Sequence, residues 1–129
     1  MILGLGNDIV SVKRIEKILE TRKEAFLAHF FSPEEKAFFK IEEINAPFIA
    51  GRGAAKEACV KALGCGFGKE CGLQDITILR EESLHASGRP VLTLSGPGKE
   101  KAGSLGVKRI SLSISHEKEY ATAIVILED

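Results

Sequence analysis

The stretch AAKEACVKALGCGFG, residues 54–68, carries a carboxylate and an ammonium group one helical turn apart. At about 100° per residue, Glu57 and Lys61 point off one helix face, about 40° apart. The two charges can therefore act on one object. An exposed pair at this spacing can also be a plain surface ion pair, worth about 0.3–0.5 kcal/mol. A third functional group beside them would favour the chemical interpretation.

The N-terminal stretch MILGLGNDIV supplies a candidate for that third group. The alternation of a strand places Gly4, Gly6 and Asp8 on one face, so we expect Asp8 on a surface cleared by glycine. One or two carboxylates, with phosphate oxygens and water, are the usual ligands of magnesium in proteins. Asp8 and Glu57 therefore predict a Mg²⁺ site, provided that folding brings them together.

Known nucleotide-binding motifs do not account for the glycines. GLG at 4–6 lacks the remaining glycine of a dinucleotide fingerprint. GCGFG at 64–68 follows a helix, whereas a Walker-type phosphate loop precedes one and ends in Gly-Lys-Ser/Thr. Taken alone, either cluster is more often a strand bend or a helix stop.

The elements that must position these residues alternate between strand and helix, without repeats or a clear domain boundary. The expected elements are a strand at 2–10, a helix from Ser11 to about 23, a helix started by SPEE at 32–35 and fading near Glu42, a long helix from about Asn45 to Leu63, strands at about 74–80 and 90–94, a short helix at about 97–104, and a hairpin of VKRISLSIS and EYATAIVIL. Period-2 and period-3.6 patterns and their stop signals give these assignments. We predict a single α+β domain over residues 1–129.

Composition excludes some classes of partner. Lysine plus arginine and aspartate plus glutamate both total 18, so no overall field draws the chain to nucleic acid or to a membrane surface. No apolar run approaches the roughly 20 residues that span a bilayer, and the N-terminus lacks signal-peptide features. Three cysteines without CxxC spacing indicate reduced thiols. We therefore expect a cytoplasmic protein.

Three stretches carry a resemblance to a known family: GLGNDIVSVKRIE, AGRGAAKEACVKALGCG and SISHEKEYATAIVI. In sequence and order they resemble the holo-[acyl-carrier-protein] synthases, small 4′-phosphopantetheinyl transferases. The resemblance implies that family's fold, an antiparallel sheet with a long central helix. It also implies transfer of 4′-phosphopantetheine from coenzyme A to a serine of an acyl carrier protein, with release of adenosine 3′,5′-bisphosphate. A homotrimer with sites at subunit interfaces is implied as well, and a 129-residue chain is small for a complete pocket.

The resemblance assigns roles to individual residues. Asp8 and Glu57 resemble the magnesium ligands, and either Glu57 or a water on the metal takes the serine proton. Lys61 would neutralise the phosphates and help the bisphosphate to leave. The further coenzyme A contacts that the resemblance implies are Arg52, Lys61, Gly64, Gly66 and His116.

A basic segment follows the first strand. Residues 13–23 hold five basic and two acidic side chains. Because acyl carrier proteins are acidic, Arg14, with Lys13, Lys17 and Arg22, resembles the surface that receives the carrier. The simpler alternative for the lysines is a solvated helix face.

Two positions depart from the family pattern. Some relatives carry basic residues just before the central helix, suited to the 3′-phosphate of coenzyme A, where this chain has Glu42 and Glu43. Either another cation serves that phosphate or its recognition is looser. Gly53 stands where many members have a bulky residue, which leaves substrate positioning there open.

Two other functions fit the same residues. A magnesium-dependent pyrophosphate hydrolase would use Asp8 and Glu57 with water as the nucleophile and would not need a basic docking helix. A non-catalytic interaction module would carry Glu57 and Lys61 only as a surface pair.

Overall fold

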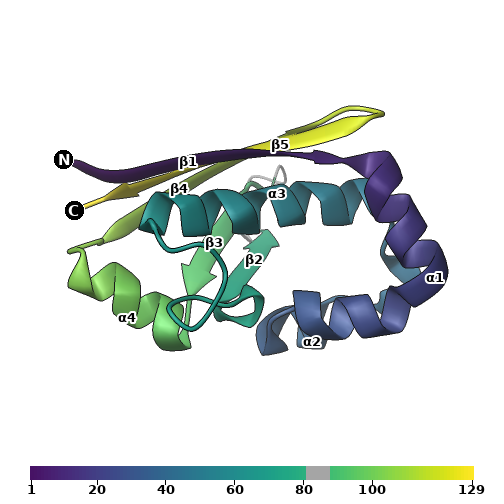
Figure 1. The fold of residues 1–129 in the computed structure, drawn as a ribbon, viewed down its shortest axis with the longest axis horizontal. Helices are drawn as coiled ribbons and strands as arrows, with labels where there is room; N and C mark the ends of the chain where they lie inside the picture. Colours follow the sequence, from purple (N-terminus) through teal and green to yellow (C-terminus); the bar gives the residue numbers. More distant parts are fainter. Residues whose placement is uncertain (81–87) are drawn as a thin grey trace.

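The computed structural model describes residues 1–80 and 88–129 (Figure 1). In chain order the elements are β1 (Ile2–Ser11), α1 (Val12–Phe30), α2 (Pro33–Phe38), the 3₁₀ turn η1 (Ile41–Glu43), α3 (Ala46–Leu63), the 3₁₀ turn η2 (Leu73–Asp75), β2 (Ile76–Arg80), β3 (Pro90–Leu94), α4 (Gly96–Ser104), β4 (Arg109–His116) and β5 (Tyr120–Glu128). The predicted α+β class and the long central helix are confirmed.

The strands form two antiparallel sheets, one of order β1-β5-β4 and one that pairs β2 with β3. Figure 1 shows α3 running along one face of the three-stranded sheet, with α1 turning away at one end. The core lies between the two sheets around α3, where Ala54, Ala55 and Cys59 are fully buried against Ile76 and Ile78 of β2. The sheets and this core hold α3 as the central element of the molecule.

The glycines of β1 allow α3 to lie directly on the strand. A Cβ atom added at Gly6 would collide with the carbonyl oxygen of Ala58, and one added at Gly4 with that of Ala62. The expectation of a cleared surface beside Asp8 is therefore wrong in part. The predicted alternation is present, but the helix backbone fills the space that the glycines leave.

Gly6→Ala is expected to destabilise the protein by about 2 kcal/mol or more, because the added methyl group must push α3 away from β1. Thermal unfolding followed by circular dichroism measures this. Gly103→Ala is the matched control, since a Cβ atom at that helical position meets nothing within 4 Å. Equal melting temperatures for the two variants would contradict the close approach of strand and helix.

Helix α1 is longer than predicted and is bent. It continues past residue 23 to Phe30, with a non-helical residue at Arg22 (φ −141°, ψ 32°). The additional turns are held by tertiary packing, because Leu27 and Phe30 are buried in a second core cluster with Ile49 of α3. The sequence pattern up to residue 23 carries no sign of this contact.

Helix α2 is shorter than predicted. Its capping box is present, with Ser32 and Glu35 exchanging side chain and backbone hydrogen bonds. The helix ends at Phe38 instead of fading near Glu42, because Phe39 adopts an extended conformation (ψ 141°). Its ring then packs against those of Phe31 and Phe48, at centroid distances of 5.7 and 5.0 Å.

A buried ion pair joins α2 to α3. Lys56 Nζ donates to Glu35 Oε1 at 2.7 Å, to the carbonyl of Phe30 at 2.6 Å and to that of Leu73 at 3.1 Å. The other carboxylate oxygen of Glu35 accepts from Ile78 N–H at 3.0 Å. Both charged side chains are fully buried, so each depends on the other for compensation.

The cysteines are unpaired, and Cys59 and Cys71 are buried. Burial raises the pKa of both thiols to about 12, so they are protonated at neutral pH. Within residues 1–80 and 88–129, no helix is both long and apolar enough to cross a membrane.

Candidate active site

Asp8 and Lys61 meet at the edge of β1. Lys61 Nζ donates to Asp8 Oδ1 at 3.0 Å and to the carbonyl oxygen of Asn7 at 3.1 Å. The Asp8 side chain is 18% exposed and that of Lys61 is 52% exposed, so the pair faces solvent. They border a hollow of about 520 Å³ that is also lined by Ile9, Thr122 and Ile124. The contact between β1 and α3 brings residues 53 positions apart into one site.

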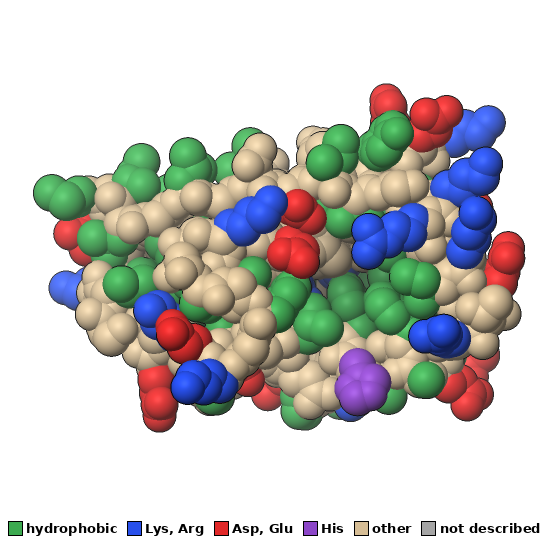
Figure 2. Space-filling model, viewed as in Figure 1, with side chains coloured by type: hydrophobic (Ala, Val, Ile, Leu, Met, Phe, Trp, Pro, Cys, Tyr) green, Lys and Arg blue, Asp and Glu red, His purple; other side chains and the backbone are tan. Residues whose placement is uncertain are grey.

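Glu57 completes a group of three charges. It is half-buried, one turn before Lys61 on α3, and its carboxylate makes no ion pair or hydrogen bond with the residues that the structure describes. Since Lys61 reaches Asp8 and shares its helix face with Glu57, both carboxylates lie on the same side of α3. Figure 2 shows acidic and basic side chains meeting near the middle of this face.

The donor set suits a cation that takes few protein ligands. Among the described residues there is no group of three or more His, Cys, Asp or Glu side chains suited to a metal ion. Asp8 and Glu57, on the same side of α3, are the two carboxylates that could hold a cation there. That is the pattern expected for magnesium, which draws its remaining ligands from phosphate and water.

The glycines after Lys61 leave the backbone open. Helix α3 ends at Gly64, which adopts a left-handed conformation (φ 77°), and Gly66 does the same (φ 65°). A Cβ atom at either position would meet nothing within 4 Å. The segment beside Lys61 is therefore accessible to a ligand, as the predicted role of Gly64 and Gly66 requires.

His116 lies exposed at the end of β4 and lines a second hollow of about 330 Å³ with Ser115 and Tyr120. Ile9 and Thr122 line this hollow as well as the one beside Asp8, so the two hollows adjoin. The structure thus connects the hollow at His116 with the one beside Asp8. The sequence motif SISH did not predict how far His116 lies from Asp8.

Arg52 does not join the group of three charges within this chain. It precedes Glu57 by five residues and Lys61 by nine, so it points about 140° and 180° away around α3. Its residue is only 7% exposed, and its guanidinium carbon lies 4.2 Å from the centre of the Phe48 ring. Burial lowers the pKa of Arg52 to about 10. The spacing of these three residues in the sequence, at about 100° per residue, already predicts this separation.

The predicted docking residues are all exposed on α1: Lys13, Arg14, Lys17 and Arg22. Lys17 and Arg22 border a hollow of about 620 Å³ inside the bend of the helix, with Ile18, Phe26 and His29 among its other lining residues. Figure 2 shows a recess floored by hydrophobic side chains and flanked by Lys and Arg. The sequence missed the apolar part of this surface, because the bend at Arg22 creates it.

Comparison with known proteins decides the family. The family described as the 4′-phosphopantetheinyl transferase superfamily matches residues 4–125. The chain belongs to this superfamily. As a phosphopantetheinyl transferase it is an enzyme, and the resemblance carried by the three sequence motifs is confirmed.

Relatives of this transferase match it from end to end. It is 42% identical to the holo-[acyl-carrier-protein] synthase of Halorhodospira halophila, over 98% of both chains. The synthase of Vibrio campbellii is 43% identical, again over 98% of both. Among solved structures, the synthase of Neisseria meningitidis has a TM-score of 0.87 and 33% identity over 100% of both chains. That of Helicobacter pylori, in complex with coenzyme A, has a TM-score of 0.79 and 39% identity over 96% of this chain and 99% of the other.

Proposed function

We propose that this transferase moves 4′-phosphopantetheine from coenzyme A to a serine of an apo acyl carrier protein. The products are the holo carrier protein and adenosine 3′,5′-bisphosphate. The observation that carries the proposal is the contact of Asp8 with Lys61 at one hollow, with Glu57 one turn before Lys61 on the same face of α3. The whole-length relatives support it, since their solved structures include complexes with coenzyme A, among them those of Helicobacter pylori and Bacillus anthracis.

Magnesium fits the two carboxylates, and Asp8 and Glu57 are the residues that would hold it. The Glu57 oxygens have no partner among the described residues, and the Asp8 side chain forms an ion pair with the half-exposed Lys61. When bound, the metal would neutralise diphosphate charge and orient the substrate for in-line displacement.

The chain's own residues would carry the remaining steps. The serine oxygen forms a bond to the phosphorus next to the pantetheine arm, and the bond from that phosphorus to the bridging oxygen breaks. Either Glu57, through a carboxylate oxygen that does not hold the metal, or a water molecule would accept the serine proton. Lys61 stabilises the negative charge that develops on the departing bisphosphate.

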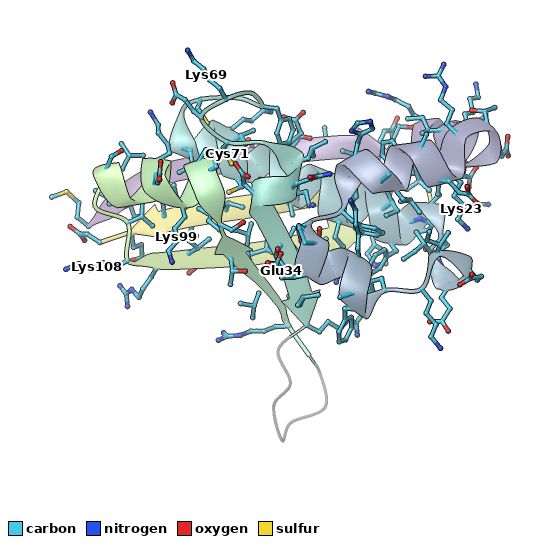
Figure 3. All side chains as sticks on the ribbon, turned by 90° about the horizontal axis from the view of Figure 1, so that it is seen from below. Lys23, Glu34, Lys69, Cys71, Lys99 and Lys108 are labelled. Atoms are coloured by element: carbon cyan, nitrogen blue, oxygen red, sulfur yellow. The ribbon has the colours of Figure 1, made fainter. Side chains whose placement is uncertain are left out.

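The basic and apolar hollow of α1 fits an acidic amphipathic helix of the carrier. The double variant Lys17→Glu/Arg22→Glu is expected to raise the KM for the carrier at least tenfold, with kcat little changed, because charge reversal repels the partner during encounter. Lys108→Glu is the control, since Lys108 lies at the other end of the molecule from Lys23 on α1 (Figure 3). Equal KM values for the two proteins would exclude docking on α1.

A homotrimer is proposed from the outer face of the three-stranded sheet. Leu5, Ile9 and Ile124 project from it with 65%, 61% and 47% of their surface exposed. Apolar side chains gathered in this way commonly mark an interface. A copy seated there would also border the His116 hollow, which shares Ile9. Sedimentation equilibrium tests the assembly, and a monomer at micromolar concentration would exclude it.

The deciding experiment is intact-mass measurement of an apo carrier protein after incubation with this chain, coenzyme A and magnesium. A gain of one phosphopantetheine group is expected, and no gain with a cognate carrier would reject the transferase. Release of product from coenzyme A without any carrier would instead support a pyrophosphate hydrolase. A cytoplasmic location is part of this proposal, and the three unpaired cysteines support it because that compartment keeps thiols reduced.

A further inference from the structure

The hollow of α1 is formed by two halves of one helix, which meet at the bend at Arg22 (Figure 1). Lys17 lines it before the bend, and Phe26 and His29 line it after the bend. Within the bend, the Thr21 hydroxyl donates to the carbonyl of Lys17 at 3.1 Å. Such a bond lets a helix bend but does not set the direction of its second half. The width of the hollow therefore depends on what holds that second half in place.

The last turn of α1 is held by side chains of other elements. The final carbonyls of a helix have no partner within it. Lys56 Nζ of α3 donates to the carbonyl of Phe30 at 2.6 Å, and Gln74 Nε2 of η2 donates to that of Ala28 at 2.9 Å. Ala28 directly precedes His29, so the bond from Gln74 reaches the segment that forms one wall of the hollow.

Gln74 and Lys56 differ in what else they do. Lys56 is fully buried and also compensates the charge of Glu35, so its removal affects the whole fold. Gln74 is exposed, and the one side-chain hydrogen bond that it forms with the described residues goes to α1. A substitution of Gln74 therefore removes that bond without opening a cavity in the core.

The 3₁₀ turn that carries Gln74 is itself anchored. The Asp75 carboxylate accepts from Gly72 N–H at 2.9 Å and from Gly98 N–H of α4 at 3.2 Å. Gln74 thus ties α1 to a fixed point of the fold. We infer, on the basis of the proposed function in which the carrier docks in the hollow of α1, that Gln74 is a positioning residue for carrier recognition. It helps to set the direction of the second half of α1, and with it the width of the hollow.

Steady-state kinetics of the full chain with an apo acyl carrier protein test this role. Gln74→Met keeps the length of the side chain without its hydrogen-bond donor. It is expected to raise the KM for the carrier about threefold to fivefold, at unchanged kcat and unchanged KM for coenzyme A, because a bond that orients α1 is lost. Ser104→Ala is the matched control and should change none of these values. It removes a hydroxyl that donates to the carbonyl of Lys101 at 2.7 Å in the last turn of α4, at the other end of the molecule from α1 (Figure 1).

A double-mutant cycle with Phe26→Ala separates positioning from direct contact with the carrier. If Gln74 acts through the wall that carries Phe26, Gln74→Met should raise the KM by no more than about 1.5-fold in the Phe26→Ala background. Phe26 is half-buried and stacks on Phe30 at a centroid distance of 5.4 Å, so all variants are assayed below their melting temperatures. The full threefold to fivefold effect in both backgrounds would show that Gln74 contacts the carrier itself and would overturn the inference.

Calorimetric binding of the apo carrier to the full chain does not require transfer, so it distinguishes this role from the proposed function. Suppose that the carrier binds Gln74→Met about threefold to fivefold more weakly than the wild type, but the wild type does not modify it. The transferase proposal would then fail, and the positioning role of Gln74 would stand. Equal affinity and equal KM for the wild type and Gln74→Met, with normal transfer, would reject the positioning role and leave the transferase proposal in place.

Discussion

Glu57→Gln is expected to slow phosphopantetheine transfer by about 10²–10³-fold while leaving the melting temperature unchanged. The amide keeps the size of the side chain but neither binds a magnesium ion as a carboxylate does nor accepts a proton. The free carboxylate of Glu57 forms no ion pair with the described residues, so its loss should not affect folding.

Initial rates of carrier modification, followed by mass, measure this effect. Glu100→Gln on α4 is the matched control, because it removes an exposed carboxylate outside the hollow beside Asp8. A Glu57→Gln enzyme that works within a factor of two of the wild type would show that the group of three charges is a surface feature, as in the interaction-module alternative.

Lys56→Met is expected to lower the free energy of unfolding by about 3–5 kcal/mol, because it leaves the fully buried carboxylate of Glu35 without its cation. The carbonyls of Phe30 and Leu73 would lose their hydrogen-bond donor as well. Burial lowers the pKa of Lys56, and the Glu35 carboxylate opposes that shift.

Urea unfolding followed by circular dichroism checks this value. Lys36→Met is the control, since Lys36 is the exposed neighbour of Glu35 on α2. Similar midpoints for the two variants would show that the buried pair contributes nothing to stability, and that methionine packs equally well in its place.

Local signals in the sequence were sufficient to predict α3 and the final hairpin. Helix α3 begins after Asn45, whose side chain accepts from Phe48 N–H at 3.0 Å, and ends at the left-handed Gly64. Both signals involve residues close together in the sequence, so the sequence alone reveals them. The bend at Arg22 and the extended conformation of Phe39 depend on contacts with distant elements, which no local pattern contains.

In the candidate site, too, local spacing predicted some features, whereas others depend on contacts between distant residues. The helical spacing predicted the common face of Glu57 and Lys61, and the strand alternation added Asp8, whose contact with Lys61 the structure measures at 3.0 Å. The same spacing places Arg52 on a different face of α3 from Glu57 and Lys61. The resemblance grouped Arg52 and Lys61 as coenzyme A contacts without regard to this difference. Lys56 carried no sign of its burial, because its neighbours in the sequence differ little from those of an exposed lysine.

The glycines of β1 also bear on how firmly the two carboxylates are spaced. The backbones of β1 and α3 are in direct contact at Gly6 and Ala58, with no side chain packed between them. Asp8 and Glu57 flank this contact along the two elements, so the main chains of β1 and α3 set their spacing. The magnesium ion proposed above would replace Lys61 beside Asp8, while this backbone contact keeps the strand and the helix in position.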